Sequence, residues 1–361
     1  MIFGIFDAMD NHKISDKNKA VLAGMTLSQL TETALQAGLP EYAGKQLANW
    51  LYKKYINDFN LITNLPAKAR AWLMQHYETG WKPHIKHQES EDGTVKYLYK
   101  TQNNGFIESV WIPEGNRSTL CVSSQVGCRM GCRFCSTAKQ GFQDQLTSGE
   151  IINQIVSLPQ RDKLTNVVYM GMGEPFDNLE NVMNSLEILT SGYGFGWSYQ
   201  RITVSTIGII PGMIHFLEKS QCHLAVSLHS PFDAQRQEMI PMQKLYPVSE
   251  VIKTIKKYDF QHQRRVSFEY ILFDGINDTQ EHALEIVRLT QGLPCRINLI
   301  AFHPFPGCIY KSPELLKMEQ FRDFLNKKGM VCTIRKSRGA DISAACGLLS
   351  TKEMNAKKTG Q

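Results

Sequence analysis

Three cysteines lie close together in the segment GCRMGCRFCSTAKQGF, residues 127–142. They are Cys128, Cys132 and Cys135, and no further cysteine follows nearby on the C-terminal side. A closed structural zinc site normally takes four ligands in two separated pairs, whereas iron–sulfur clusters are held by cysteine thiolates. A four-iron cluster held by three thiolates would leave one iron open to another ligand. There are two alternatives to such a cluster. The cysteines could simply pack in the core, or they could form a zinc knuckle that is completed by Cys121 or a histidine.

A glycine-rich strand end follows one strand–helix unit later, in VVYMGMGEPFDN. Gly171 and Gly173 let the backbone approach a ligand closely, and Glu174 offers a carboxylate to an ammonium group. Turns between strands and helices are often rich in glycine, so this motif alone is weak. Beside the three cysteines it predicts a site where an α-amino acid chelates the open iron while Glu174 and the turn hold its ammonium.

These motifs lie in a region that alternates between two kinds of pattern. Helix-like stretches occur near residues 148–157, 178–189, 211–219, 248–258, 279–290 and 313–327. Between them lie the apolar runs NVVYMGM, RITVST, CHLAVSL, RVSFEYILF, RINLIAF and VCTIR. Such alternation predicts an α/β fold with a parallel sheet of about six or seven strands. We therefore expect an open or partial barrel, with its site at the carboxyl ends of the strands.

The regions flanking this core differ in pattern. Residues 25–83 read as three short helices with basic and aromatic residues, which suits either an RNA-docking domain or a plain helical cap. Residues 84–113 alternate with period two around Asn104-Gly105, which predicts a β-hairpin linker. We expect residues 114–347 to form the core, and residues 1–24 and 348–361 to be loose tails.

Composition narrows the class of protein. The 361 residues include 42% hydrophobic and 20% charged residues, which is ordinary for a globular protein. A net charge of +6 permits a nucleic-acid partner without establishing one. No apolar run approaches the roughly 18–20 residues that cross a bilayer, so no membrane is expected. Nine cysteines without a secretion signal favour reduced thiols and a cytoplasmic location.

Taken together, these motifs resemble the radical S-adenosylmethionine (SAM) superfamily, and within it the RlmN and Cfr family of RNA adenine methyltransferases. The blocks stand in the family's order over roughly residues 25–350: TLCVSSQVGC, CSTAKQGF, NVVYMGMGEP, VSTIGIIP, SLHSP, INLIAFHPFPG and DISAACG. The resemblance implies a partial (β/α)6 radical-SAM barrel with a small N-terminal helical domain and a β-hairpin extension. It also implies a 4Fe-4S cluster on Cys128, Cys132 and Cys135, and two SAM molecules per turnover.

The resemblance assigns roles to three further residues. It implies that one SAM methylates Cys346, that a radical made from a second SAM activates this S-methyl group, and that the resulting carbon adds to the adenine. Cys121 would then help to remove a proton and form a disulfide that releases the base. Glu108 matches a proton acceptor of the family, although its place in FIESVWI also suits a solvent-facing strand residue.

The family's cofactor contacts match Gly173, Glu174, Ser205, Ser227, Leu228, His229 and His303. His303 stands where the family usually has asparagine, so that contact is left open. Histidine can still donate or accept a hydrogen bond there.

The implied substrates are an adenosine of 23S rRNA in the peptidyl-transferase centre and adenosine 37 of some tRNAs, methylated at carbon 2. The alternative is carbon-8 methylation of rRNA, as by the Cfr enzymes that confer antibiotic resistance on ribosomes. More distant alternatives are a radical-SAM enzyme acting on a small molecule or peptide, and a non-enzymatic zinc module that binds RNA. We expect a monomer that receives electrons from an external donor such as flavodoxin or ferredoxin.

Overall fold

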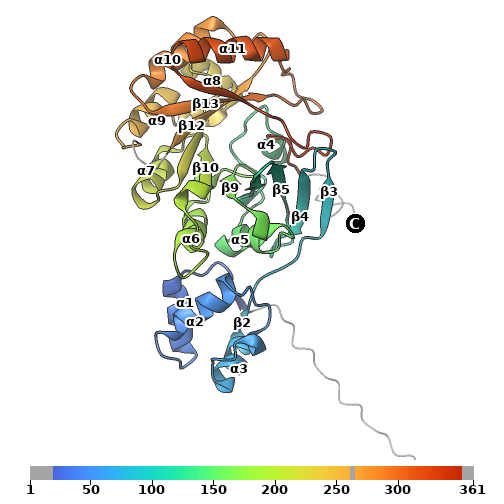
Figure 1. Ribbon diagram of the computed structural model, residues 1–361, viewed down its shortest axis with the longest axis vertical. Helices are drawn as coiled ribbons and strands as arrows, with labels where there is room; N and C mark the ends of the chain where they lie inside the picture. Colours follow the sequence, from blue (N-terminus) through green and yellow to red (C-terminus); the bar gives the residue numbers. More distant parts are fainter. Residues whose placement is uncertain (1–18, 261–264, 352–361) are drawn as a thin grey trace, which may run out of the picture.

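The computed structural model describes residues 19–260 and 265–351. Its main sheet has ten strands in the order β14-β13-β12-β11-β10-β9-β6-β5-β4-β3. A smaller helical unit formed by the N-terminal residues lies at the bottom of the view in Figure 1. No helix in these two ranges is long and apolar enough to cross a membrane.

Seven strands of this sheet pair in parallel, and neighbours along it follow the chain order. They are β6 (Arg117–Cys121), β9 (Asn166–Tyr169), β10 (Ile202–Thr206), β11 (His223–Ser227), β12 (Val266–Leu272), β13 (Cys295–Ala301) and β14 (Val331–Arg335). Within the described residues, β6 and β14 do not pair with each other, so the barrel stays open. The predicted α/β partial barrel is confirmed.

The connections between these strands carry the helices that cover the sheet. They are α4 (Ser136–Gln140), α5 (Ser148–Val156), α6 (Leu179–Thr190), α7 (Ile210–Lys219), α8 (Asp233–Met239), α9 (Val248–Ile255), α10 (Gln280–Thr290) and α11 (Leu315–Lys327). Short 3-10 helices lie at Arg161–Lys163, Pro175–Asp177, Tyr199–Arg201 and Pro241–Lys244. The patterns predicted six of the eight α-helices. They missed α4 and α8, whose five and seven residues are too few to show a helical period.

Three antiparallel strands extend the sheet beyond β6: β5 (Phe106–Glu114), β4 (Val95–Lys100) and β3 (Lys86–Glu89). The predicted hairpin is present, and Asn104 in its turn has a positive φ of 61°. Residues 84–113 are more than a linker, because their strands continue the sheet of the barrel. A small separate ladder joins β7 (Gln125–Val126) to β8 (Asp144–Gln145) beside the cysteine segment.

The N-terminal unit contains α1 (Leu27–Gln36), α2 (Ala43–Tyr52), a 3-10 helix (Phe59–Leu61) and α3 (Ala67–His76), and its strands β1 (Ala20–Val21) and β2 (Tyr77–Glu78) pair in parallel. Its apolar core is completed by Ile152 and Val156 of α5 and Ile188 of α6. Gly24 and Gly149 bring the two units together, since a Cβ on Gly24 would lie 2.1 Å from the Gly149 nitrogen.

At both ends of the chain, some residues that were expected to lie in tails belong to the folded structure. Residues 20–21 form a strand, and Leu349, Ser350 and Thr351 make hydrogen bonds to the barrel. The remaining parts of both expected tails, residues 1–18 and 352–361, lie outside the described residues.

Candidate functional site

A cavity of about 170 Å³ lies at the carboxyl ends of the parallel strands, where the architecture predicts a site. Its walls come from the ends of all seven strands and from the cysteine segment. Of the predicted site residues, the lining includes Cys121, Cys128, Cys132, Cys135, Gly173, Glu174, Ser205, Ser227, His229 and Cys346. Leu228, His303 and Glu108 are not among them.

The three clustered cysteines occupy a tight loop between β7 and α4, with Cys135 at the N-cap of α4. The loop depends on Gly127, whose φ is +74°, because a Cβ there would lie 1.7 Å from the carbonyl oxygen of Gly141. Burial raises the pKa of the Cys128 thiol to about 12 and that of Cys132 well above its usual value. Without a bound metal these thiols therefore stay protonated, whereas coordinated iron would deprotonate them.

The donor set of three cysteine thiols is the kind that holds an iron–sulfur cluster. Within the described residues, no group of three or more His, Cys, Asp or Glu side chains is placed to hold one metal ion. The irons of a cluster are separate atoms, so its thiolates need not converge on one point. The three thiols line one cavity. Burial is the main cause that raises the pKa of Cys132, and the charges of Cys135 and Cys128 raise it further. A 4Fe-4S cluster thus fits Cys128, Cys132 and Cys135.

Glu174 follows β9 and points into this cavity from a fully enclosed position. Its carboxylate accepts hydrogen bonds from Thr206 Oγ1 at 2.6 Å and from the backbone nitrogens of Ile207 and Phe176 at 3.0 and 3.2 Å. Burial raises its pKa to about 7, although these three donors lower it. A carboxylate has about four lone-pair sites, so one place remains for the donor of a ligand.

His229 lies just after β11 with a φ of 55°, a backbone region that histidine rarely adopts. Its Nδ1 accepts a hydrogen bond from the backbone nitrogen of Ile271 at 3.0 Å, so in the neutral ring Nε2 carries the proton. Burial, and then the charge of Arg236, lowers its pKa to about 3. His229 is therefore a neutral ring that carries its proton on Nε2.

Cys121 and Cys346 come together although 224 positions separate them. Cys121 ends β6 and is buried, whereas Cys346 lies beyond β14 and is exposed. Burial raises the pKa of Cys121 to about 12; charge on Cys346 raises it further, and Arg335 lowers it. The two thiols thus share the cavity and lie near enough for the charge of one to act on the other.

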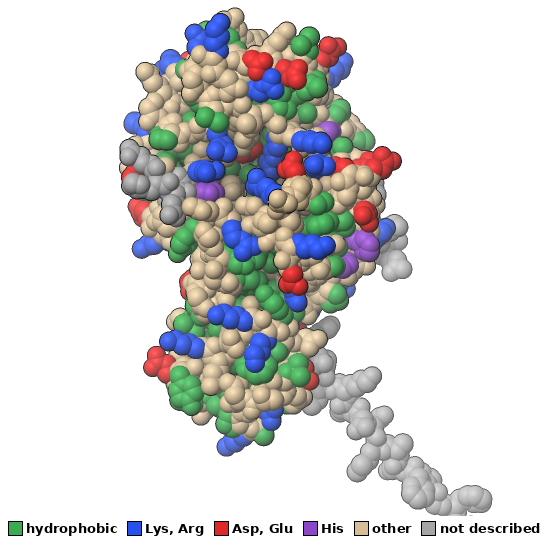
Figure 2. Space-filling model, viewed as in Figure 1, with side chains coloured by type: hydrophobic (Ala, Val, Ile, Leu, Met, Phe, Trp, Pro, Cys, Tyr) green, Lys and Arg blue, Asp and Glu red, His purple; other side chains and the backbone are tan. Residues whose placement is uncertain are grey.

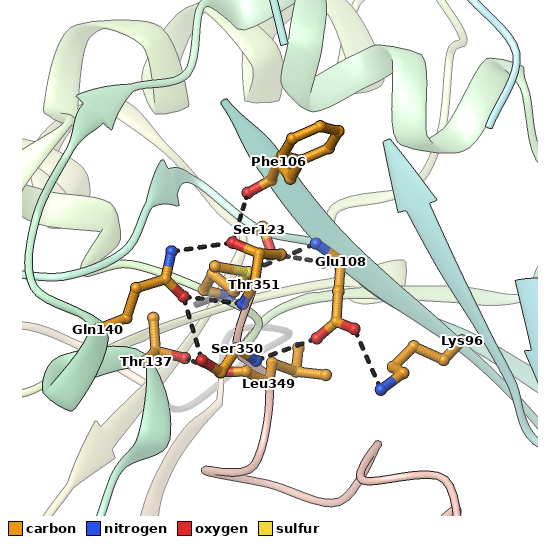
Figure 3. A network of polar contacts seen from close by, with 10 residues as sticks. Lys96, Phe106, Glu108, Ser123, Thr137, Gln140, Leu349, Ser350 and Thr351 are labelled. Carbon is orange, nitrogen blue, oxygen red and sulfur yellow. Dashed lines mark hydrogen bonds and ion pairs between the residues drawn. The ribbon is translucent and has the colours of Figure 1, made fainter. Parts of the chain in front are cut away.

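Glu108 of β5 is buried, so the solvent-facing alternative is wrong. Its carboxylate forms an ion pair with Lys96 at 3.1 Å and accepts a hydrogen bond from the backbone nitrogen of Ser350 at 3.0 Å (Figure 3). Burial raises its pKa, although the charge of Lys96 lowers it. Since it does not line the cavity, its role as a proton acceptor stays a prediction.

Leu228 and His303 also lie off the cavity. Leu228 is fully buried, and its backbone carbonyl accepts a hydrogen bond from the guanidinium of Arg236. His303 lines a neighbouring groove, where its Nε2 pairs with Ser337 Oγ. Their predicted contacts with a cofactor are not tested by this arrangement.

Sequence reasoning missed Arg335, the last residue of β14. It lines the cavity and pairs with the buried Glu269 at 3.5 Å, and Glu269 is held in turn by Ser267 and Asn298. Alternation along VCTIR could have indicated an inward-facing arginine, but nothing in the sequence placed it beside Cys121. Thr206, which holds Glu174, was missed as well.

A groove of about 490 Å³ adjoins the cavity. The two hollows share a wall that includes Glu269, Arg335, Ala344, Ala345 and Cys346. The basic residues of the groove are Arg117, His223, Arg265, Arg296, His303, Arg335, Lys336 and Arg338. Figure 2 shows lysine and arginine side chains gathered across the middle of the face that it draws. Cys346 therefore stands where the cavity meets a groove rich in arginine and lysine side chains.

Comparisons with known proteins agree with this site. Residues 122–288 match the radical SAM superfamily, and residues 20–79 match the ribosomal RNA large subunit methyltransferase N-terminal domain. The chain is 55% identical to a probable dual-specificity RNA methyltransferase RlmN of Parabacteroides distasonis, over 92% of this chain and 97% of that protein. It is 42% identical to the dual-specificity RNA methyltransferase RlmN of Aliarcobacter butzleri, over 88% and 93%.

A solved structure is similar over nearly the same length. It is a radical SAM methyltransferase from Sphaerobacter thermophilus, with a TM-score of 0.85 and 38% identity, and the match covers 91% of this chain and 99% of that one.

Proposed function

The chain belongs to the RlmN family of radical SAM RNA methyltransferases, and from that premise we propose that it methylates carbon 2 of an adenosine in 23S rRNA and in tRNA. One observation carries the proposal. Cys121 and Cys346 line the same cavity as the three clustered cysteines, and Cys346 also faces a basic groove. A zinc module that only binds RNA needs neither thiol, and a radical enzyme acting on a small molecule needs no such groove.

The cofactors fit the residues that are present. Cys128, Cys132 and Cys135 would hold the cluster, while Glu174, with Gly173, Ser205, Ser227 and His229 around it, would hold SAM. When bound, the reduced cluster and SAM supply a methyl group and the radical chemistry that activates it. Glu174 would offer its remaining acceptor site to the ammonium of SAM, and His229 would donate from Nε2. We propose that two SAM molecules are used in each turnover.

Cys346 is the proposed methyl carrier. Its exposed sulfur can receive a methyl group on the cavity side and present it to a base on the groove side. An electron-poor carbon such as carbon 2 of adenine offers no electron pair to a sulfonium, so a carrier that delivers carbon by another route is needed. Cys121, buried at the end of β6, is the proposed partner that releases the product as a disulfide forms.

The groove is the proposed binding site for the RNA. Phosphate contacts from arginine and lysine supply most of the affinity of such complexes, and an unpaired base can leave its loop to enter a pocket. We propose that the enzyme works as a monomer in the cytoplasm and receives electrons from an external donor such as flavodoxin or ferredoxin.

Mass analysis of nucleosides tests this function. RNA from cells that lack the gene should lose 2-methyladenosine from 23S rRNA and tRNA, and a plasmid copy should restore it. The purified enzyme should produce the same nucleoside on both RNAs in vitro. Formation of 8-methyladenosine would favour the carbon-8 alternative, and unchanged RNA would contradict both.

Replacing two groove arginines should weaken RNA binding without affecting the thiol chemistry. We expect Arg265→Ala together with Arg296→Ala to lower the slope of log Kd against log salt by about 1.4, because each contact to a single strand contributes about 0.7. Methylation of Cys346 should continue at the wild-type rate. Arg322→Ala is the control, since Arg322 lies on α11 and pairs with Asp323. An unchanged slope in the double variant would exclude this groove.

A further inference from the structure

Four of the five residues that follow Cys346 form hydrogen bonds with the segment after the cluster loop or with β5, and Figure 3 shows those of Leu349, Ser350 and Thr351. The backbone nitrogen of Ser136 donates to the Gly347 carbonyl at 2.7 Å, and Thr137 Oγ1 donates to the Leu349 carbonyl at 2.6 Å. Ser136 directly follows Cys135, and Gly347 directly follows Cys346. The chain that would carry the methyl group is thus bonded to the residue next to a proposed cluster ligand.

Gln140, the last residue of α4, holds the end of this segment. Its Oε1 accepts hydrogen bonds from the Thr351 nitrogen at 2.9 Å and from Ser350 Oγ at 3.3 Å. Its Nε2 donates to Thr351 Oγ1 at 2.9 Å, and that hydroxyl donates to the Phe106 carbonyl at 3.0 Å. Gln140 does not line the cavity, so these contacts are separate from the reacting groups.

Glu108 closes the other side of the segment. One carboxylate oxygen accepts the hydrogen bond of the Ser350 nitrogen, and the other pairs with Lys96. Lys96 and Glu108 are both largely buried, with side-chain exposures of 11% and 9%. Loss of either partner would leave an uncompensated buried charge and destabilise the fold. The pair therefore keeps β4, β5 and Ser350 in one arrangement.

We propose that residues 347–351 form a latch, fastened by Gln140 and Glu108, which sets the position of the Cys346 sulfur relative to the cofactor site. In this proposal, which rests on the proposed function, Gln140 and Glu108 are positioning residues that act through Cys346. The geometry supports this proposal because the latch begins at the residue after Cys346 and is bonded at its end to α4, the helix that follows the cluster loop. Methyl transfer and hydrogen abstraction depend steeply on where the acceptor lies, so a loose latch slows both.

The Gln140→Leu variant of the full-length enzyme tests the latch. It removes three hydrogen bonds and keeps a side chain of similar size. We expect the rate of Cys346 methylation, measured by mass analysis of the peptide, to fall about tenfold. This corresponds to a rise of roughly 1.4 kcal/mol in the activation free energy. The 5′-deoxyadenosine formed per methylated adenosine should rise several-fold, and backbone amides of residues 347–351 should exchange hydrogen faster. Iron content should stay at the wild-type level.

Three further variants complete the test. Gln102→Leu is the control, because Gln102 is an exposed glutamine in the hairpin turn. Glu108→Ala should slow Cys346 methylation as Gln140→Leu does, because the Ser350 nitrogen loses its acceptor. Thr351→Val, which replaces only the hydroxyl by a methyl group, takes the place of Gln140→Leu if that variant does not fold.

The outcomes separate two failures. A wild-type enzyme that never acquires a methyl group on Cys346 contradicts the proposed function itself. Wild-type enzyme that does acquire it, with Gln140→Leu and Glu108→Ala methylated at the same rate and exchanging hydrogen normally at residues 347–351, overturns the latch alone.

Discussion

Replacement of Cys121 by alanine is expected to leave the enzyme covalently joined to its RNA. The protein should co-purify with nucleic acid, and the complex should survive denaturation and be removed by nuclease. Turnover should stop after the first adduct forms. The reason lies in the thioether between Cys346 and the methylene group on the base, which is stable until a second sulfur attacks it.

The cavity supports Cys121 as the proposed second sulfur. Its thiol shares the cavity with Cys346, and the other cysteines that line this cavity are the three proposed cluster ligands. In the proposed release step, the sulfur of Cys121 bonds to the sulfur of Cys346, and the bond from Cys346 to the methylene carbon breaks and leaves its electron pair on that carbon. The carbon then takes a proton and becomes the methyl group. A thiol reductant must afterwards reopen the disulfide.

Two variants serve as controls for this result. Adding Cys346→Ala to Cys121→Ala should abolish the adduct, because no carrier remains. Cys332→Ala removes another buried cysteine, one that lies outside the cavity, and should leave release unchanged. A Cys121→Ala enzyme that turns over many times with no trapped RNA would refute the assigned role.

Replacement of Cys128, Cys132 or Cys135 by alanine is expected to abolish cluster binding. Anaerobically reconstituted wild-type protein should bind about four irons and show the broad visible absorbance of a cluster, and each variant should lose both. The three thiols lie on one loop and line one cavity, so each replacement removes one of the three proposed protein ligands of the cluster. Cleavage of SAM should disappear with the iron.

Cys308→Ala provides the matched control. Its sulfur lies 3.9 Å from the Arg133 carbonyl, beside the cysteine loop, but Cys308 does not line the cavity. It should keep its iron and its absorbance. If the triple variant at positions 128, 132 and 135 still bound about four irons, the assignment of the cluster would be wrong.

The sequence by itself determined the parts of this protein whose signals are local. The spacing of Cys128, Cys132 and Cys135 and the glycines before Glu174 each lie within a few residues. The alternation of apolar runs with helical patterns defines the barrel, because side-chain periods of 2 and 3.6 are properties of a single element. The capping boxes at Thr26 and Thr147 depend on equally local signals, since a box spans four positions.

Only the tertiary structure decided what depends on contacts between distant segments. It brings Cys346 to Cys121, buries Glu108 between Lys96 and Ser350, places Arg335 beside both thiols, and leaves His303 in the groove instead of the cavity. No local pattern encodes these pairs, because each joins strands or loops that meet when the sheet curves into an open barrel. Their positions are set by how the whole sheet packs, and packing depends on every layer at once.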